Sequence, residues 1–463
     1  MLVPRLCFSM NFNLGMGTSS SSPIEPTDPL DILIVGDLSG RSSRGVIEPL
    51  AGRSRIEVDD ADGLCARLAP KIAVAGIELS PTSLDDFHAD HLQRHPAGNA
   101  APATSTNTPT PTEPPKPAPS ESGSAFGDLL GSEANAKPAD AVQDAVSKMI
   151  ASAMGGASKA TPDTPASIDH AWLRSVLADP GFREAELAWR ALHWFETRVE
   201  VGEHARLLAL DASAAEVRTA IDDGGVDALT EALFADRPPS DPPALVVLLD
   251  TFAATADDLA RLRQLGSAAS AAGVPVVAGI DPAIFGCHGI AETPDSTAWD
   301  AQSIDADVRD AWAELCESDA GRALVLAAPR VLLRAPYGSE TEPTDVPGFA
   351  EVPLDAPPPH ELLCWAPGSL AAGVAIAAGL GVAGRGIRLA GAAEVDQLPM
   401  HTFTVDRDQH VVPPAETWLS DRALEHISGF GLTPIGSLRH RDAARVGPIR
   451  SLAGDVRAWW QRG

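Results

Sequence analysis

Residues 244–279 read ALVVLLDTFAATADDLARLRQLGSAASAAGVPVVAG, and this stretch decides the fold. Its first part, 244–250, is an unbroken apolar run that ends in Asp, which is typical of a strand buried on both faces. Residues 257–272 have the composition of a helix, and 274–279 form a second apolar run. A strand, a helix and a strand with short connections form a right-handed crossover, so we predict a mainly parallel sheet with helices packed on it.

Further apolar runs lie on both sides of this crossover. The C-terminal side adds 323–327, and the N-terminal side adds 206–210 and the run DILIVGD at 31–37. The last run contains three β-branched residues before Gly36, which predicts a buried strand with a sharp exit and a sheet to join. The expected fold class is therefore α/β, with mainly parallel or mixed sheets flanked by helices.

Shifts in composition predict the domain organisation. Residues 1–28 are a flexible tail, 29–95 form a small α/β unit, and 167–456 form a larger α/β body. Between the last two lies a Pro-, Ala- and Ser-rich linker at 96–166, with seven prolines in residues 101–120. This composition buries too little apolar surface to offset the entropy of ordering, so we expect a disordered linker.

One segment of the linker has helical periodicity. Apolar residues recur every four positions in residues 139–154 and mark one helical face: Val142, Val146, Ile150 and Met154. An apolar stripe flanked by flexible sequence is typical of an element that docks into a partner's groove. The stripe can instead dock on the chain's own body, and the sequence leaves both interpretations open.

Composition excludes several classes of function. The 463 residues include 35 Lys and Arg against 63 Asp and Glu, a formal net charge of -28, which disfavours nucleic-acid binding. The five cysteines form no C-x-x-C pair, which argues against a disulfide framework and a zinc finger. No apolar run approaches the roughly 20 residues that span a bilayer, and the N-terminus lacks the apolar core of a secretory signal. We therefore expect a cytoplasmic protein that is not embedded in a membrane.

A series of motifs resembles the large subunit of the type VI secretion contractile sheath, TssC or VipB, from residue 168 to residue 452. In chain order the motifs are PGFREAELAWRALH at 180–193, DPAIFG at 281–286, PRVLLRAPYG at 329–338 and LPMHTF at 398–403, followed by Glu416, Asp421, Arg422, Gly429 and Phe430. Ala185 and Glu186 occupy the Leu-Glu positions of the family motif. The order of the motifs is also that of the family.

The N-terminal unit resembles the small sheath subunit, TssB or VipA. The family's first strand and turn appear as IVGDLSG at 34–40, and its acidic segment appears as SLDDFHADHL at 83–92, with Ala89 in place of a proline. The chain thus looks like a fusion of the two subunits. It looks C-terminally shortened as well, because family large subunits continue beyond the position of Leu452.

The resemblance implies a non-enzymatic structural function without a cofactor. A sheath subunit packs around a tube and contributes to contraction, and the implied partners are other sheath subunits, the tube protein, baseplate components and a ClpV-type AAA+ ATPase. The shortened C-terminus motivates an alternative, a non-polymerising baseplate or sheath-end adaptor. A third interpretation, an α/β enzyme with a nucleotide cofactor, rests on the crossover and on GLGVAG at 379–384. Those glycines follow a predicted helix and precede a strand, the reverse of the dinucleotide-binding order, so we interpret them as a helix end.

The candidate subunit-contact residues are Arg330, Arg334 and Tyr337. The two arginines lie four residues apart, and guanidinium groups pair with carboxylates. Those carboxylates belong either to a neighbouring subunit or to this acidic chain, and both interpretations stay open. Tyr337 is the only tyrosine, and an aromatic ring with a polar tip suits a half-buried anchor. The resemblance also makes the 139–154 helix a candidate handle for the recycling ATPase.

Histidines give no catalytic or metal site. His88, His91 and His95 share one helical face and could hold zinc, but Pro96 and the linker start there, so we predict a solvated face and no metal. His401 lies between apolar neighbours, which predicts a core histidine rather than a catalytic base. The chain has no Walker lysine motif and no nucleophile elbow, so we predict no catalytic residue.

Overall fold

The computed structural model describes residues 29–95, 169–235, 243–339, 341–387, 389 and 391–453. The described residues from 29 to 95 and from 170 onward belong to one compact unit. The expected tail at 1–28, the linker at 96–166 and its helix at 139–154 lie outside the described residues. Our expectations about them therefore stay predictions.

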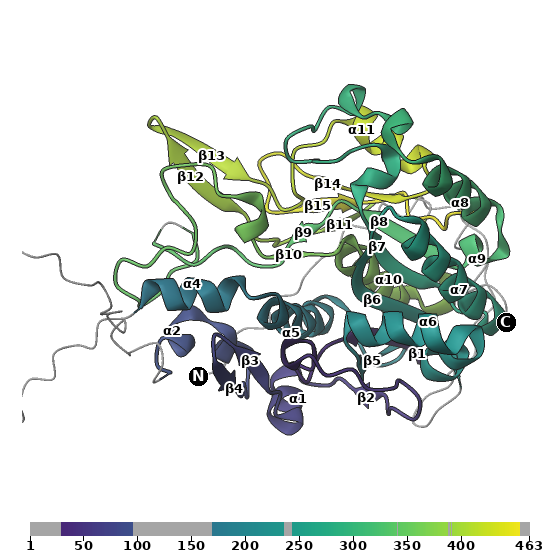
Figure 1. The fold of residues 1–463 in the computed structure, drawn as a ribbon, viewed down its shortest axis with the longest axis horizontal. Helices are drawn as coiled ribbons and strands as arrows, with labels where there is room; N and C mark the ends of the chain where they lie inside the picture. The colour runs from purple at the N-terminus through teal and green to yellow at the C-terminus, as the bar shows by residue number, and fades with distance from the viewer. Residues whose placement is uncertain are drawn as a thin grey trace, which may run out of the picture. The chain divides into compact units, whose positions relative to one another are not determined.

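Among the described residues, nine strands form a mixed sheet at the centre of this unit (Figure 1). In spatial order they are β11 (Ala393–Val395), β15 (Ala444–Val446), β14 (Thr433–Ser437), β8 (Leu324–Ala328), β7 (Val276–Ile280), β6 (Leu245–Phe252), β1 (Leu30–Gly36), β5 (Ala205–Asp211) and β2 (Ile56–Glu57). The strands from β14 to β5 are parallel, and β2, β15 and β11 are antiparallel to their neighbours. The α/β class with a mainly parallel sheet is confirmed.

Strand β1 lies inside this sheet. It pairs in parallel with β5 on one side and β6 on the other, so that Ile32 is opposite both Leu207 and Leu245. Its apolar side chains are almost fully buried, as expected of a strand covered on both faces. The N-terminal segment therefore contributes an inner strand to the sheet of the larger body, and the predicted buried strand at 31–37 is confirmed.

Helices cover both faces of the sheet (Figure 1). One layer comprises α6 (Ala214–Leu229), the π-helical turn η3 (Thr230–Phe234), α7 (Ala256–Ala272), α8 (Ala306–Glu317), α9 (Asp319–Arg322) and α11 (Asp421–Gly429). The opposite face is covered by α5 (Pro180–Arg198) and α10 (Gly368–Ala383). Successive β1 side chains point alternately to the two faces of the sheet. Leu33 and Val35 pack against the helical layer that contains α6, α7 and α8.

Helix α10 is buried along almost its whole length. Gly373 lets it approach the sheet closely, because a Cβ there would lie 2.8 Å from Val247 Cγ1. In the described part of the chain, the one helical stretch apolar and long enough to cross a membrane is Gly368–Gly386, formed by α10 and η8, and 83% of its apolar 18-residue window is buried inside the protein. This burial identifies it as a core helix. Helix α10 itself ends at Gly384, at φ +53°, as the glycine pattern at 379–384 predicted.

Shorter elements complete the unit. In the N-terminal segment they are η1 (Ser42–Arg44), α1 (Ala61–Leu68), β3 (Ile72–Val74), β4 (Ile77–Leu79), η2 (Leu84–Phe87) and α2 (Ala89–Leu92). The body adds α4 (His170–Ala178), η4 (Pro282–Phe285), η5 (Ser296–Ala298), η6 (Ala301–Ser303), β9 (Val331–Leu332), η7 (His360–Leu362), β10 (Trp365–Ala366), η8 (Gly384–Gly386), β12 (His401–Val405) and β13 (Asp408–Val412). Phe87 packs on Phe182 at 5.6 Å between ring centroids, which ties the N-terminal segment to α5.

Candidate subunit-contact site

The segment 329–338 starts where β8 ends and pairs through β9 with β10. Leu332 is opposite Trp365 in this short antiparallel pair, so the segment is held in its middle. The side chains of its two arginines have very different surroundings: that of Arg330 is 34% exposed, and that of Arg334 is 5% exposed.

Arg334 lies in a buried cluster of charges. Its Nε donates to Glu186 Oε1 at 2.7 Å, and its Nη1 and Nη2 donate to the two carboxylate oxygens of Glu351 at 2.7 and 3.0 Å. Burial opposes the charged form of Glu186, but the positive charges of Arg334 and Arg190 outweigh it and lower the pKa of this carboxyl. Paired and hydrogen-bonded in this way, the buried charges are compensated within the chain.

Tyr337 belongs to the same cluster. Its hydroxyl accepts a hydrogen bond from Arg190 Nη2 at 3.0 Å, and the Arg334 guanidinium lies over its ring at 4.4 Å from the centroid. Its backbone N–H donates to Glu351 Oε2 at 2.9 Å. The expected half-buried position is wrong: the side chain is almost fully buried, because these partners enclose the ring and its polar tip.

Arg330 forms a second, more exposed cluster around Glu416. Its Nε and Nη2 donate to Glu416 Oε1 at 3.0 and 2.8 Å, and its backbone N–H donates to Oε2 at 2.8 Å. His360 Nε2 lies 2.8 Å from the same Oε1. Burial alone would raise the pKa of Glu416, but the bonds from His360 and Arg330 prevail and lower it.

The internal-pairing interpretation thus describes both arginines in the single chain. A contact with a neighbouring subunit stays a prediction, and of the three candidate residues Arg330 is the one whose side chain reaches the surface. The partners Glu186 and Glu416 stand at motif positions in the sequence. The local sequence pattern could not predict their pairing, because Glu186 lies 148 residues from Arg334 and Glu416 lies 86 residues from Arg330.

Arg190, Arg334 and Tyr337 also line a polar pocket of about 420 Å³. Its other walls include His88 from the N-terminal segment, Glu342 and the loop 397–400. The pocket thus lies where the N-terminal segment meets the segment 329–338. It presents charges of both signs and does not define one class of ligand.

The three histidines of the N-terminal segment turn to different partners. His88 Nδ1 accepts from the backbone N–H of Asp90 at 3.2 Å, and His91 Nδ1 lies 3.1 Å from Asp86 Oδ1. His95 stacks on the Trp172 ring instead. Within the described residues, no group of three or more His, Cys, Asp or Glu side chains is arranged to hold a metal ion.

His401 is a core histidine, as predicted. Its side chain is fully buried, Nδ1 lies 3.1 Å from Thr341 Oγ1, and Nε2 has no hydrogen-bond partner in the described part of the chain. Burial lowers its pKa to about 4. The neutral imidazole is therefore the form that the fold accommodates.

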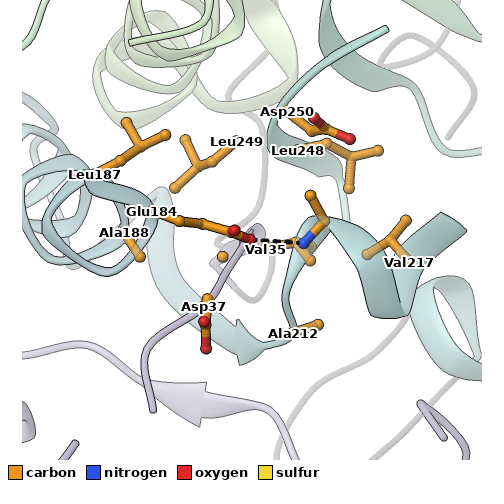
Figure 2. A pocket seen from close by; sticks show the side chains of 12 residues that line it. Val35, Asp37, Glu184, Leu187, Ala188, Ala212, Val217, Leu248, Leu249 and Asp250 are labelled. Carbon is orange, nitrogen blue, oxygen red and sulfur yellow. Dashed lines mark hydrogen bonds between the residues drawn. The ribbon is translucent and has the colours of Figure 1, made fainter. Parts of the chain in front are cut away.

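The carboxyl ends of β1 and β6 enclose a second, much smaller cavity (Figure 2). Open α/β sheets bind cofactors at this kind of position, where the strand order reverses. Here Glu184 and Leu187 of α5 fill the crevice, and Glu184 accepts from the backbone N–H of Ala214 at 2.9 Å. The remaining volume is about 10 Å³, room for about one water molecule.

Two acidic side chains beside this cavity have raised pKa values. Burial raises the pKa of Asp250 to about 6, against the opposing charge of Arg218. Burial also raises the pKa of Asp37, although the backbone N–H groups of Ser42 and Arg41 donate to it. The crevice is too small to hold a nucleotide.

The described residues thus form an α/β body whose motif residues pair in internal charge clusters and whose crevice at the strand switch point is filled. The family model described as VipB: EvpB/VC_A0108, tail sheath N-terminal domain, matches residues 166–452, more than half of the chain. The chain belongs to this family. The resemblance of 29–95 to the small subunit lies outside the matched residues and stays a prediction.

One curated relative is the type VI secretion system sheath protein TssC1 of Pseudomonas aeruginosa strain PAO1. It is 25% identical to this chain over 292 residues, which cover 60% of this chain and 57% of the relative. The match thus spans a little over half of that protein's length. Both comparisons agree on the large-subunit type, as the motifs indicated.

Proposed function

We propose that this chain is a cytoplasmic, non-enzymatic structural subunit of a type VI secretion sheath or a sheath-like assembly. The observation that carries the proposal is the family match over residues 166–452. The described geometry supports it physically. The mixed sheet is packed on both faces and the motif arginines are fixed by buried glutamates, so the unit is suited to act as a rigid block.

In the proposed assembly the chain packs around the tube protein and contributes to contraction. Its partners are other sheath subunits and baseplate components. Arg330 provides a contact with a neighbouring subunit at the surface, while Arg334 and Tyr337 act indirectly, because their buried cluster fixes the segment that carries Arg330.

Co-assembly tests this proposal. The full-length chain is mixed with the tube protein and the other sheath subunits of its source, and the mixture is examined by electron microscopy and pull-down. Tubular or ring-shaped particles that contain the chain support the proposal. Stable binding to particle ends without incorporation identifies the adaptor instead, and absence of both binding and incorporation refutes a sheath role.

We also propose that the 139–154 helix is the handle for a ClpV-type AAA+ ATPase, through Val142, Val146, Ile150 and Met154. Position before the body and the apolar stripe support this. The variant V146D/I150D places two charges on the stripe. Loss of ATPase binding at an unchanged melting temperature is the expected result, and a large drop in melting temperature without ATPase binding by the parent chain identifies a helix of the fold.

A further inference from the structure

The strands of the N-terminal segment, residues 29–95, alternate with strands of the body in the central sheet. The spatial order runs from β6 of the body to β1 of the segment, and then to β5 of the body and β2 of the segment. Both neighbours of β5 therefore come from the segment. Without the segment, the facing edges of β5 and β6 would be separated by the width of one strand, with their backbone N–H and C=O groups unpaired. The body thus contains a slot for one parallel strand.

Strand β1 fills this slot along its whole length. All seven of its residues are in register with β5, and four are in register with β6. Two more backbone bonds fix its ends, because the Ala244 N–H donates to the Asp31 carbonyl at 2.7 Å and the Ala212 N–H donates to the Gly36 carbonyl at 2.9 Å. The apolar side chains of β1 are almost fully buried. With β1 paired on both edges and covered on both faces, the slot has no room for a second strand.

Charged side chains of the body select this strand by the residues at and beyond its two ends. At the start of β1, Arg206 of β5 donates from Nε and Nη2 to the two carboxylate oxygens of Asp31, at 2.7 and 3.0 Å. Beyond its end, the buried Glu216 of α6 accepts from Arg41 Nε at 2.8 Å and from Arg53 Nη2 at 2.7 Å. Both of these arginines belong to the segment. The slot is therefore specific for a strand with these charges as well as with an apolar run.

The linker does not have to span a distance to bring the segment into the slot. The described residues on its two sides meet, since the His95 ring stacks on the Trp172 ring at 6.4 Å between centroids. A flexible linker in this geometry gives the tethered segment an effective concentration on the order of a millimolar. A separate chain present at about a micromolar therefore competes for the slot at a disadvantage of roughly a thousandfold.

We propose that the slot between β5 and β6 is a strand-binding site that this chain keeps closed with its own N-terminal segment. The site takes an apolar parallel strand with an acidic residue at its start and arginines beyond its end. A separate chain that carries such a strand, such as a separate small sheath subunit, is excluded from it. The inference rests on the proposed function and deepens it: the chain enters a sheath or sheath-like assembly without a separate small subunit in this slot.

Exchange of the segment between full-length copies tests the inference. A protease site is placed in the linker at 101–120, and one of two preparations carries a fluorescent protein ahead of residue 1. After cleavage the two pieces should stay together on a sizing column, because the strand pairing and the ion pairs do not involve the linker. In urea below the unfolding transition, cleaved labelled and cleaved unlabelled copies should exchange segments. Uncleaved copies should take up roughly a hundredfold less label in the same time, since their own segment is tethered.

Variants at the start of β1 test the recognition by charge. In D31K a lysine faces Arg206, and exchange between cleaved copies should be roughly a hundredfold faster than in the parent. E78K is the matched control, because it makes the same change in charge within the segment, at an exposed pair of Glu78 with Lys71. D31K/R206E restores opposite charges and should bring the exchange rate back toward that of the parent. Circular dichroism confirms that each variant is folded.

Several results overturn the inference. These are pieces that separate as soon as the linker is cut, uncleaved copies that take up label as fast as cleaved ones, and D31K exchanging no faster than E78K. Cleaved copies that never exchange overturn it as well, because the segment is then an inseparable part of the core and not the occupant of a site. The proposed function is judged separately, by co-assembly with the tube protein. A chain that assembles only with a separate small subunit bound in this slot keeps the function and loses this inference.

Discussion

Replacing Arg334 by Met should destabilise the fold strongly. The change removes the bonds to Glu186 at 2.7 Å and to Glu351 at 2.7 and 3.0 Å. Glu186 keeps Arg190 at 2.8 Å, but Glu351 is left buried, with its bond from the Tyr337 backbone N–H. Removing one partner of a buried ion pair costs roughly 3–5 kcal/mol, because the other charge stays buried without compensation.

Urea unfolding of parent and variant, followed by tryptophan fluorescence, measures this loss. The matched control is R263Q, since Arg263 and Glu314 form an exposed pair at 3.4 Å, and its effect should stay below about 1 kcal/mol. Adding E351L to R334M removes the orphaned carboxylate and should recover part of the lost stability. An R334M variant as stable as R263Q would refute the argument that burial makes this cluster costly to break.

Three further predictions concern acidity and packing. His401 has a pKa of about 4 in the folded chain and about 6.5 in the unfolded chain, so the unfolded chain binds more protons between these pH values. The free energy of unfolding should therefore fall as pH drops from 6.5 to 4, by up to about 3 kcal/mol. The variant H401Q should show a weaker dependence of unfolding free energy on pH in this range. Glu216, whose bonds from Arg53 and neighbouring groups outweigh burial and lower its pKa to about 2, should lose its stabilising contribution as pH falls from 4.5 to 2, and E216Q should lack that transition. G373L should cost about 1–3 kcal/mol in the same urea assay, since a Cβ at Gly373 already lies 2.8 Å from Val247 Cγ1, whereas G386A, with no atom within 4 Å of its Cβ, should be near neutral.

The local sequence pattern was sufficient to predict where the strands lie, but not which strands pair with one another. The apolar runs at 31–37 and 244–250 predicted buried strands, because continuous β-branched and aliphatic sequence has few other stable arrangements. That β1 pairs with both β5 and β6 is a matter of long-range contact, set by packing across intervening segments, which periodicity does not encode.

The candidate site divides in the same way. Sequence identified Arg330 and Arg334, since two arginines flanking an apolar run need anionic partners. It could not select Glu186, Glu351 and Glu416 among 63 acidic residues, because those pairs form only when distant segments fold together. The burial of Tyr337 was also missed, since its enclosure depends on Arg190 of α5 and on the backbone of its own turn.

Many α/β proteins with this strand order hold a cofactor in the crevice at the carboxyl ends of the strands. What occupies the crevice between β1 and β6 is therefore informative for this chain. In those proteins the carboxyl ends of the strands stay open at the switch point. Here α5 lies across them: Glu184 bonds to Ala214, and a Cβ on Gly36 would touch Ala188 at 3.0 Å. With the crevice filled, α5 packs directly against β1 and β5 and beside the end of β6. Helix α5 also carries Glu186, Arg190 and Arg183. The helix that fills the crevice therefore also positions the groups that fix the Arg334 cluster and the turn at η7. The filled crevice and the rigid segment 329–338 therefore depend on one element, helix α5, and a change that displaces α5 should disturb both.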